Sequence, residues 1–171
     1  KIFNLCHDFL CWTHPEFFPI DWNTADNIVL SLSNRRKYRH NLFTSTITRG
    51  VYINDINKGD EREYPVFPIG ADSLGLLTRN YVPSTHEFLV IGTLEPRKQP
   101  ISILRAFKSL RSAGHDVKLC FAGRMGWLEA EDKAEFLEAA DNFGWMRWVD
   151  GPTDETLPDL KMECRATLYL S

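Results

Sequence analysis

Short apolar runs alternate with amphipathic stretches over the second half of the chain, and this alternation constrains the fold more than any other feature. The runs are rich in β-branched and aromatic residues and have the length of strands. Alternating strands and helices of this kind predict an α/β fold, with a doubly wound parallel sheet and right-handed crossovers. The four expected strands are 87–92 (EFLVIG), 117–123 (VKLCFAG), 145–149 (WMRWV) and 166–170 (ATLYL).

The segments between these runs carry helix start and stop signals. We expect the first helix to begin at Pro100 and to end before Gly114. A second helix is expected over 130–142, and a third one after a cap at Thr153, with Pro158 in its first turn. The first helix should bury a stripe of residues at three-residue spacing: Ile101, Leu104, Phe107 and Leu110.

The first half of the chain is less regular but also indicates α/β structure. Residues 1–6 predict a strand, and His7–Pro19 a loop that follows it. A second strand is expected over 42–45, with a helix from Ser45-Thr46 to about Ile56. Residues 64–69 (YPVFPI) should be extended, because proline disfavours helical structure in the residue before it.

These patterns divide the chain into two Rossmann-like units, each shorter than a usual doubly wound domain. We assign 1–72 to a partial first unit and 87–171 to a partial second unit. Between them, 73–86 lacks clear periodicity and is expected to be a linker.

Charge and hydropathy exclude several classes of protein. The chain has 20 basic and 23 acidic residues, which argues against a general nucleic-acid binder. No apolar run is long enough to span a bilayer. We expect a cytoplasmic protein, because the cysteine usage described below indicates a reducing compartment. We interpret the basic cluster 35–40 as a solvated helix end; contact with the inner face of an anionic membrane is the alternative interpretation.

One group of side chains has some of the character of a metal site. Cys6, His7, Cys11 and His14 lie close together in the sequence, but no second pair of ligands follows at a distance, as zinc sites usually require. We interpret the group as a strand end running into a loop and expect no metal. The cysteines form no C-x-x-C pair, which is consistent with a reducing compartment.

The loop after the first strand of the second unit, GTLEPRKQ (92–99), is the strongest candidate site. Ligands of doubly wound sheets bind outside the carboxyl ends of the strands. Arg97 and Lys98 stand there directly before a helix N-terminus, which itself favours anions. They predict a clamp for a diphosphate; a solvated surface pair is the alternative. In either case we expect Lys98 to be mostly solvated without a ligand.

Glycines mark the ends of the next two strands. Gly123 and Gly126 permit either close approach of a ligand or a tight turn. Gly151-Pro152 permits main-chain contacts with a ligand or a plain strand-to-helix turn. If the sheet is parallel, Gly92, Gly123 and Gly151 should all lie at one edge.

Several of these motifs together resemble family 4 glycosyltransferases, which have the GT-B fold of two Rossmann-like domains. The resemblance is strongest over 88–127, which begins FLVIGTLEPRKQ and ends FAGRMGW. It extends to VDGPTDETLPDL in the same half, and to LCHDFLCWTHPEFFP and YPVFPIGAD in the first half. Two departures stand out: Gln99 replaces the usual Asn or Gly, and Thr93 stands where some members have an Arg.

The resemblance implies a retaining transferase that moves a sugar from a nucleotide-diphosphate donor to a hydroxyl of a glycan or lipid-linked acceptor. Polysaccharide or glycolipid synthesis would be the setting, with no cofactor and no metal. Arg97 and Lys98 would hold the diphosphate above Gly92 and Thr93, while His7 would approach the transferred sugar. The loops after the other strands would border the ligand: Gly123, Gly151 and Pro152.

The end of the sequence affects what activity we expect. At Ser171 the chain stops where the family's two-glutamate segment would begin, so we expect these residues alone to be inactive. Two other classes remain open: another GT-B enzyme, such as an epimerase or phosphorylase, and a non-catalytic module that binds nucleotide or sugar.

Overall fold

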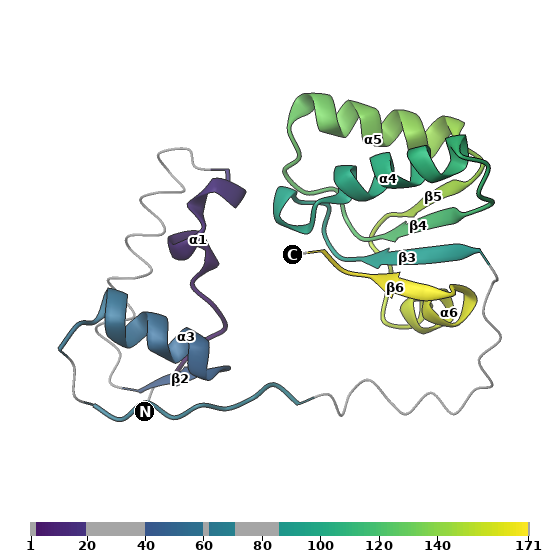
Figure 1. Cartoon of the computed structure of the whole chain (residues 1–171). Helices are drawn as coiled ribbons and strands as arrows, with labels where there is room; N and C mark the ends of the chain where they lie inside the picture. Colours follow the sequence, from purple (N-terminus) through teal and green to yellow (C-terminus); the bar gives the residue numbers. More distant parts are fainter. Residues whose placement is uncertain (1–2, 20–39, 60–61, 71–85, 171) are drawn as a thin grey trace. The chain divides into compact units, whose positions relative to one another are not determined.

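The second half of the chain builds a four-stranded sheet in which every pair of neighbouring strands is parallel (Figure 1). The strand order is β5-β4-β3-β6, so the chain moves outward from β3 to β5 and then returns across β3 to β6. The predicted α/β fold is confirmed. The strands are β3 (Glu87–Ile91), β4 (Lys118–Ala122), β5 (Met146–Val149) and β6 (Ala166–Leu168).

This description rests on a computed structural model, which describes residues 3–19, 40–59, 62–70 and 86–170. The chain divides into two units, 1–77 and 78–171, each of which is treated separately below. The basic residues of 35–39 and nearly all of the expected linker 73–86 lie outside the described residues. Among the described helices, none is long and apolar enough to cross a membrane.

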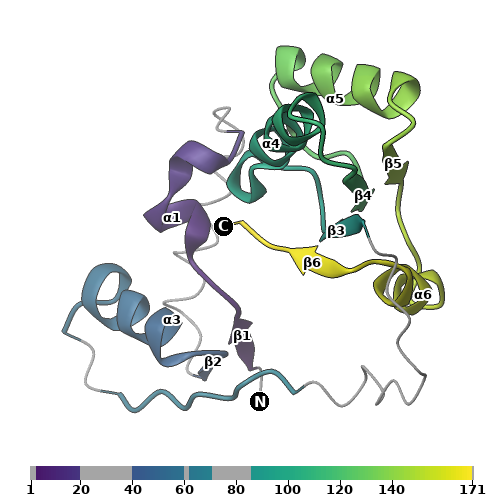
Figure 2. The same ribbon diagram turned by 45° about the vertical axis from the view of Figure 1, so that its right-hand side comes forward.

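Helices cover both faces of the four-stranded sheet (Figure 2). Along the two central strands, β3 and β4, residues alternate between the two faces and both sets contribute buried side chains, as in other parallel sheets. The helices α4 (Pro100–Ser112) and α5 (Ala130–Asn142) pack on one face, and α6 (Thr156–Glu163) packs on the other.

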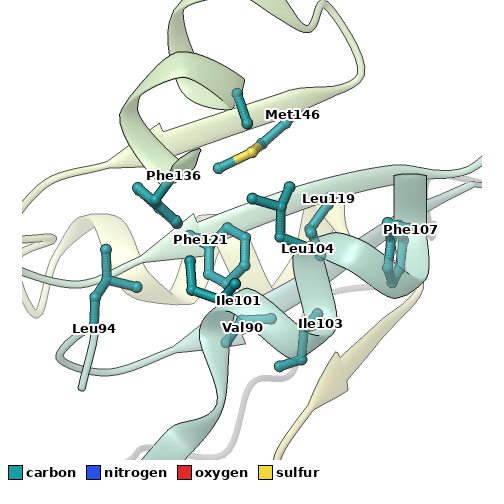
Figure 3. Close-up of a cluster of buried hydrophobic side chains, with 11 residues drawn as sticks. Val90, Leu94, Ile101, Ile103, Leu104, Phe107, Leu119, Phe121, Phe136 and Met146 are labelled. Atoms are coloured by element: carbon teal, nitrogen blue, oxygen red, sulfur yellow. The ribbon is translucent and has the colours of Figure 1, made fainter. Parts of the chain in front are cut away.

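The larger core lies beneath α4 and α5 (Figure 3). Phe121 of β4 and Phe136 of α5 meet edge to face, with ring centroids 5.0 Å apart. Phe136 also contacts the ring of Trp148, 5.6 Å away, which ties β5 to the same cluster. Aromatic pairs of this geometry add to the stability that comes from burying their area.

The opposite face, under α6, uses two cysteines as small apolar side chains. Cys120 of β4 and Cys164 after α6 are buried in a cluster with Leu89 and Leu160. Burial raises the pKa of Cys120 to about 12 and that of Cys164 to about 11, so both stay protonated thiols at neutral pH. Both thiols thus pack as small hydrophobic side chains.

The ends of α4 follow the sequence signals. Pro100 occupies the first turn, and Gly114, with φ +88°, follows the helix as predicted. The N–H of His115 donates to the Leu110 carbonyl, which completes the expected glycine-terminated end. The predicted stripe is wrong at Leu110, which is 40% exposed, because residues spaced by three drift around a helix of 3.6 residues per turn and Leu110 faces away from Ile101; Ile103 is buried in addition.

The third helix begins later than predicted. The predicted cap is correct only in part: the Thr156 N–H donates to the Thr153 hydroxyl and the Thr153 N–H to the Thr156 hydroxyl, but the residue directly before α6 is Glu155, which makes no side-chain cap bond. This reciprocal pair has the form of a capping box. However, 154–155 form a turn, so α6 starts at Thr156, with Pro158 in its first turn as expected.

The first unit contains a two-stranded parallel sheet of β1 (Asn4–Cys6) and β2 (Asn41–Phe43). Val66 adds a parallel bridge to Phe43, in the segment predicted to be extended. Helix α3 (Thr46–Val51) begins after a Ser45 cap and continues as a π-helical turn to Ile56, which is where the helix was predicted to end.

The predicted loop 7–19 is wrong in part. It contains a short helix, α1 (Leu10–Thr13), and a 3-10 turn, η1 (Pro15–Phe17). Phe9, which precedes α1, is buried between the rings of Phe43 and Tyr52, with centroids 6.5 and 6.1 Å away. Packing of this aromatic ring anchors the residue that directly precedes α1, within the predicted loop.

The Phe136→Ala substitution tests the larger core. It removes a fully buried ring and should lower the free energy of unfolding by about 3–5 kcal/mol. The exposed Glu138→Ala on the same helix is the control and should change it by no more than about 0.5 kcal/mol. Urea unfolding followed by circular dichroism measures both, and equal effects would contradict this description of the core.

Candidate functional site

The loops that follow β3, β4 and β5 meet at the carboxyl edge of the sheet. Gly92 follows β3 directly, Gly123 follows β4, and Gly151 lies two residues beyond β5. The Gly92 N–H donates to the Ala122 carbonyl, and the Gly123 N–H donates to the Val149 carbonyl, at 2.9 and 3.0 Å. The prediction that these three glycines share one edge is confirmed.

The strand order distinguishes one place along that edge. Because β4 and β6 lie on opposite sides of β3, the direction of winding reverses at β3. Ligands of open α/β sheets bind where this reversal occurs, outside the carboxyl ends of the strands. The residues that follow β3 and β6 there are the 92–99 loop and Tyr169.

A buried carboxylate joins the two cations of the 92–99 loop. Glu95 has a side chain only 7% exposed, and its Oε1 lies 2.5 Å from a terminal guanidinium nitrogen of Arg97. The same oxygen lies 3.6 Å from Nζ of Lys98. Pro96–Lys98 form a 3-10 turn, which brings both cations back toward Glu95. Sequence reasoning did not assign Glu95 a role, although it stands in the quoted motif.

Lys98 reaches back over the end of β3. A Cβ added to Gly92 would lie 2.6 Å from Nζ of Lys98, and Gly92 itself has φ +123°. The lysine side chain is therefore 20% exposed, and the expectation that it is mostly solvated is wrong. Lys98 is drawn inward for two reasons: Gly92 at the strand end has no side chain in its way, and the carboxylate of Glu95 attracts its ammonium group.

Arg97 has a second partner on the neighbouring strand. The side chain of Tyr169, which follows β6, interacts with its guanidinium and helps to raise the pKa of Arg97. Burial opposes the charge of Arg97, but the Glu95 carboxylate and the Tyr169 hydroxyl outweigh this, so the pKa of Arg97 is raised above its ordinary value. Tyr169 was not predicted, because only the tertiary structure places it beside β3.

Gln99 closes the loop in an uncommon conformation. It has φ 48° and ψ 44°, in the left-handed region, and it is the only described non-glycine residue with positive φ. Asn and Gly adopt this region at lower cost than Gln. The usual Asn or Gly in the family that this loop resembles therefore has a physical explanation, and Gln99 stores strain directly before α4.

The glycines after β4 are explained by packing. A Cβ on Gly123 would overlap the Gly92 carbonyl oxygen, and one on Gly126 would lie 2.5 Å from the Leu94 carbonyl oxygen. The two loops also exchange hydrogen bonds, since Leu94 N–H donates to Arg124 O and Gly126 N–H to Leu94 O. These contacts show that the two glycines are needed for close packing of the two loops, which neither sequence interpretation had named.

Gly151 borders an open hollow of about 430 Å³ at the same edge. Its φ is +61°, and the position of its absent Cβ lies 3.4 Å from Nε of Arg124. Arg124 is exposed and contributes a third cation that sequence reasoning left unassigned. Pro152 is half-buried just beyond, and Thr93 is half-buried in the first loop. The hollow is lined by Arg124, Met125, Asp150 and Gly151.

His7 belongs to the first unit and follows β1 at its carboxyl end, as predicted. Its side chain is exposed, and its carbonyl accepts hydrogen bonds from the hydroxyls of Thr44 and Thr48, at 2.9 and 3.2 Å. These bonds hold the His7 backbone against the start of α3.

The four metal-like side chains of the first unit do not converge. Cys6 is fully buried in the aromatic core, whereas His7 is exposed and His14 pairs with Glu16 at 3.1 Å. Across the described residues, no group of three or more His, Cys, Asp or Glu side chains is placed to hold a metal ion.

The packing of Lys98 on Gly92 generates a prediction. Gly92→Ala should lower the free energy of unfolding by about 1–3 kcal/mol, because the new methyl group meets Lys98 and the backbone strain increases. Gly144→Ala is the control: nothing lies within 4 Å of its Cβ position, so stability should stay within about 0.5 kcal/mol. Thermal unfolding compares the two, and similar losses would contradict the described contact.

The conformation of Gln99 generates another prediction. Gln99→Asn should raise the free energy of unfolding by about 0.5–1 kcal/mol, since Asn tolerates left-handed φ better and the strain of about 1–2 kcal/mol is partly relieved. Gln99→Ala keeps the strain and should bring no gain. Chemical denaturation measures the free energy of unfolding of both variants. A gain in stability for the Ala variant alone would show that the strain argument is wrong.

Comparison with known proteins adds a distant and partial similarity. No family model matches the chain. Three curated Escherichia coli proteins, each called serotype-specific mannosyltransferase WbdA, are similar to part of it. Two are 32% identical over 85 residues, which is 49% of this chain and 10% of the relative. The third is 31% identical over 105 residues, 61% of this chain and 12% of the relative. The chain spans about a tenth of the length of these relatives, and its similarity is to a glycosyltransferase.

Proposed function

We propose that this chain is part of a retaining glycosyltransferase, and that its second unit binds the diphosphate of a nucleotide-sugar donor. The observation that carries the proposal is the cluster of Arg97 and Lys98 around Glu95, at the point of the sheet where the winding reverses. Two cations in an enclosed, preset geometry beside the first turn of α4 suit a ligand with several negative charges. The partial similarity to mannosyltransferases supports the same assignment.

The proposed chemistry follows from where charge develops. As the sugar leaves, it becomes oxocarbenium-like and the departing diphosphate gains negative charge. Arg97 and Lys98 would stabilise that charge more in the transition state than in the ground state, which is the condition for acceleration. The leaving phosphate would accept the proton of the acceptor hydroxyl, so this scheme uses no protein nucleophile.

The remaining assignments complete the proposal. Gly92 and Thr93 would lie beneath the diphosphate, and Gly123, Gly151 and Pro152 would border the nucleotide near the hollow beside Arg124. The first unit would serve the acceptor, a glycan or a lipid-linked sugar, and supply His7 toward the transferred sugar. The relatives' name makes mannose the first donor sugar to test.

Lys98→Ala tests the diphosphate site directly. Losing one charge-assisted contact should weaken binding of guanosine or uridine diphosphate by about ten- to a hundredfold, measured by titration calorimetry. Binding of the corresponding nucleosides should barely change. In the longer protein, turnover should fall about 10²–10³-fold, by analogy with loss of one preorganised donor.

Lys108→Ala is the matched control. Lys108 also belongs to the α4 region and also pairs with a carboxylate, that of Glu135 at 2.8 Å, but it lies on the α5 side of the helix. The Lys108→Ala substitution should leave nucleotide binding unchanged. Equal losses of nucleoside and diphosphate binding in Lys98→Ala would indicate a collapsed loop, and unchanged binding would refute the clamp. Analysis of the turnover products separates a transferase from an epimerase or phosphorylase.

A further inference from the structure

We infer that Glu95 is a positioning residue, which presets Arg97 and Lys98 for the diphosphate without contacting it. The inference rests on the proposed function and deepens it. It assigns a role to a buried carboxylate that lies between two cations, where a carboxylate would otherwise oppose the binding of an anion.

The geometry gives Glu95 a different place from its two partners. Its side chain is 7% exposed, whereas those of Arg97 and Lys98 are 23% and 20% exposed. The carboxylate therefore lies behind the cations, and an incoming anion meets positive charge first. Both cations share the same Glu95 oxygen, so a single group sets the positions of both.

Three further contacts support the arrangement, one from the backbone and two from side chains. The Lys98 N–H donates to the Glu95 carbonyl at 3.0 Å, which closes the 3-10 turn. Nζ of Lys98 occupies the space that a side chain at position 92 would need. Tyr169 also interacts with Arg97. Each cation therefore has a neighbour of its own besides Glu95, which is the group common to both.

Glu95 has two opposite effects on the affinity of this cluster for an anion. Two cations and one carboxylate leave a formal charge of +1 rather than +2. Freeing the cations would therefore increase the attraction for an anion. It would also leave two long side chains to be ordered on binding, each of which opposes affinity. Positioning and simple charge thus predict opposite effects for loss of Glu95, and this makes the role testable.

Glu95→Asp is the sharper of two variants, because it keeps the charge and withdraws the carboxylate from both cations. Glu95→Gln keeps the shape and removes the charge. Both should weaken binding of guanosine or uridine diphosphate about five- to tenfold, measured by calorimetry. Both should also increase the motion of the Arg97 Nε–H and Lys98 side-chain signals in NMR relaxation of the ligand-free protein.

Glu135→Gln is the matched control. Glu135 also accepts from an Arg and a Lys, with Arg105 at 2.7 Å and Lys108 at 2.8 Å, on the outer surface between α4 and α5. Glu135→Gln changes the net charge by the same amount as Glu95→Gln. It should change neither the affinity for the nucleoside diphosphate nor the NMR signals of Arg97 and Lys98. Thermal unfolding of all three variants verifies that they fold.

The two measurements separate the possible failures. If Arg97 and Lys98 are as ordered in both Glu95 variants as in the original protein, or if affinity rises in Glu95→Asp, the positioning role is wrong. A rise in Glu95→Gln alone would show that net charge outweighs order and would also overturn it. If the original protein binds neither nucleoside diphosphate, the proposed function fails, while the NMR comparison still decides whether Glu95 orders the cations.

Discussion

The parallel pairing of four strands is the constraint on which the second unit depends. Parallel neighbours need a crossover between them, and the crossovers α4, α5 and α6 bury both faces of the sheet. The same geometry brings every carboxyl end to one edge. The loops that carry Gly92, Gly123 and Gly151 meet there as a consequence, although they are far apart in the sequence.

Within that edge, the pairing of Glu95 with two cations changes the character of the site. An Arg-Lys pair in a loop is ordinarily solvated and weakly held. Here the buried carboxylate and the bare backbone of Gly92 draw Lys98 inward, and Tyr169 interacts with Arg97 from the adjacent strand. In the proposed site these contacts would order the cations before the ligand binds, which is what electrostatic preorganisation requires.

The site also concentrates local strain and close packing. Gln99 is held in the left-handed region at the entrance to α4, and Gly123 and Gly126 allow the second loop to lie against the first. Backbone strain of this kind persists where surrounding structure over-determines it, and it is common at ligand sites. The hollow beside Arg124 and Gly151 adds a recess next to this packed edge.

The sequence by itself determined the alternation of strands and helices, the ends of α4, and the gathering of three glycines at one edge. These follow from local periodicity, from proline and glycine preferences, and from the geometry of a parallel sheet. The tertiary structure alone decided the strand order that puts Tyr169 beside β3, the burial of Lys98, and the packing of Phe9 directly before α1. Each of these three features depends on contacts between residues distant in sequence or on the direction in which a side chain leaves a turn. A local sequence pattern encodes neither kind of information.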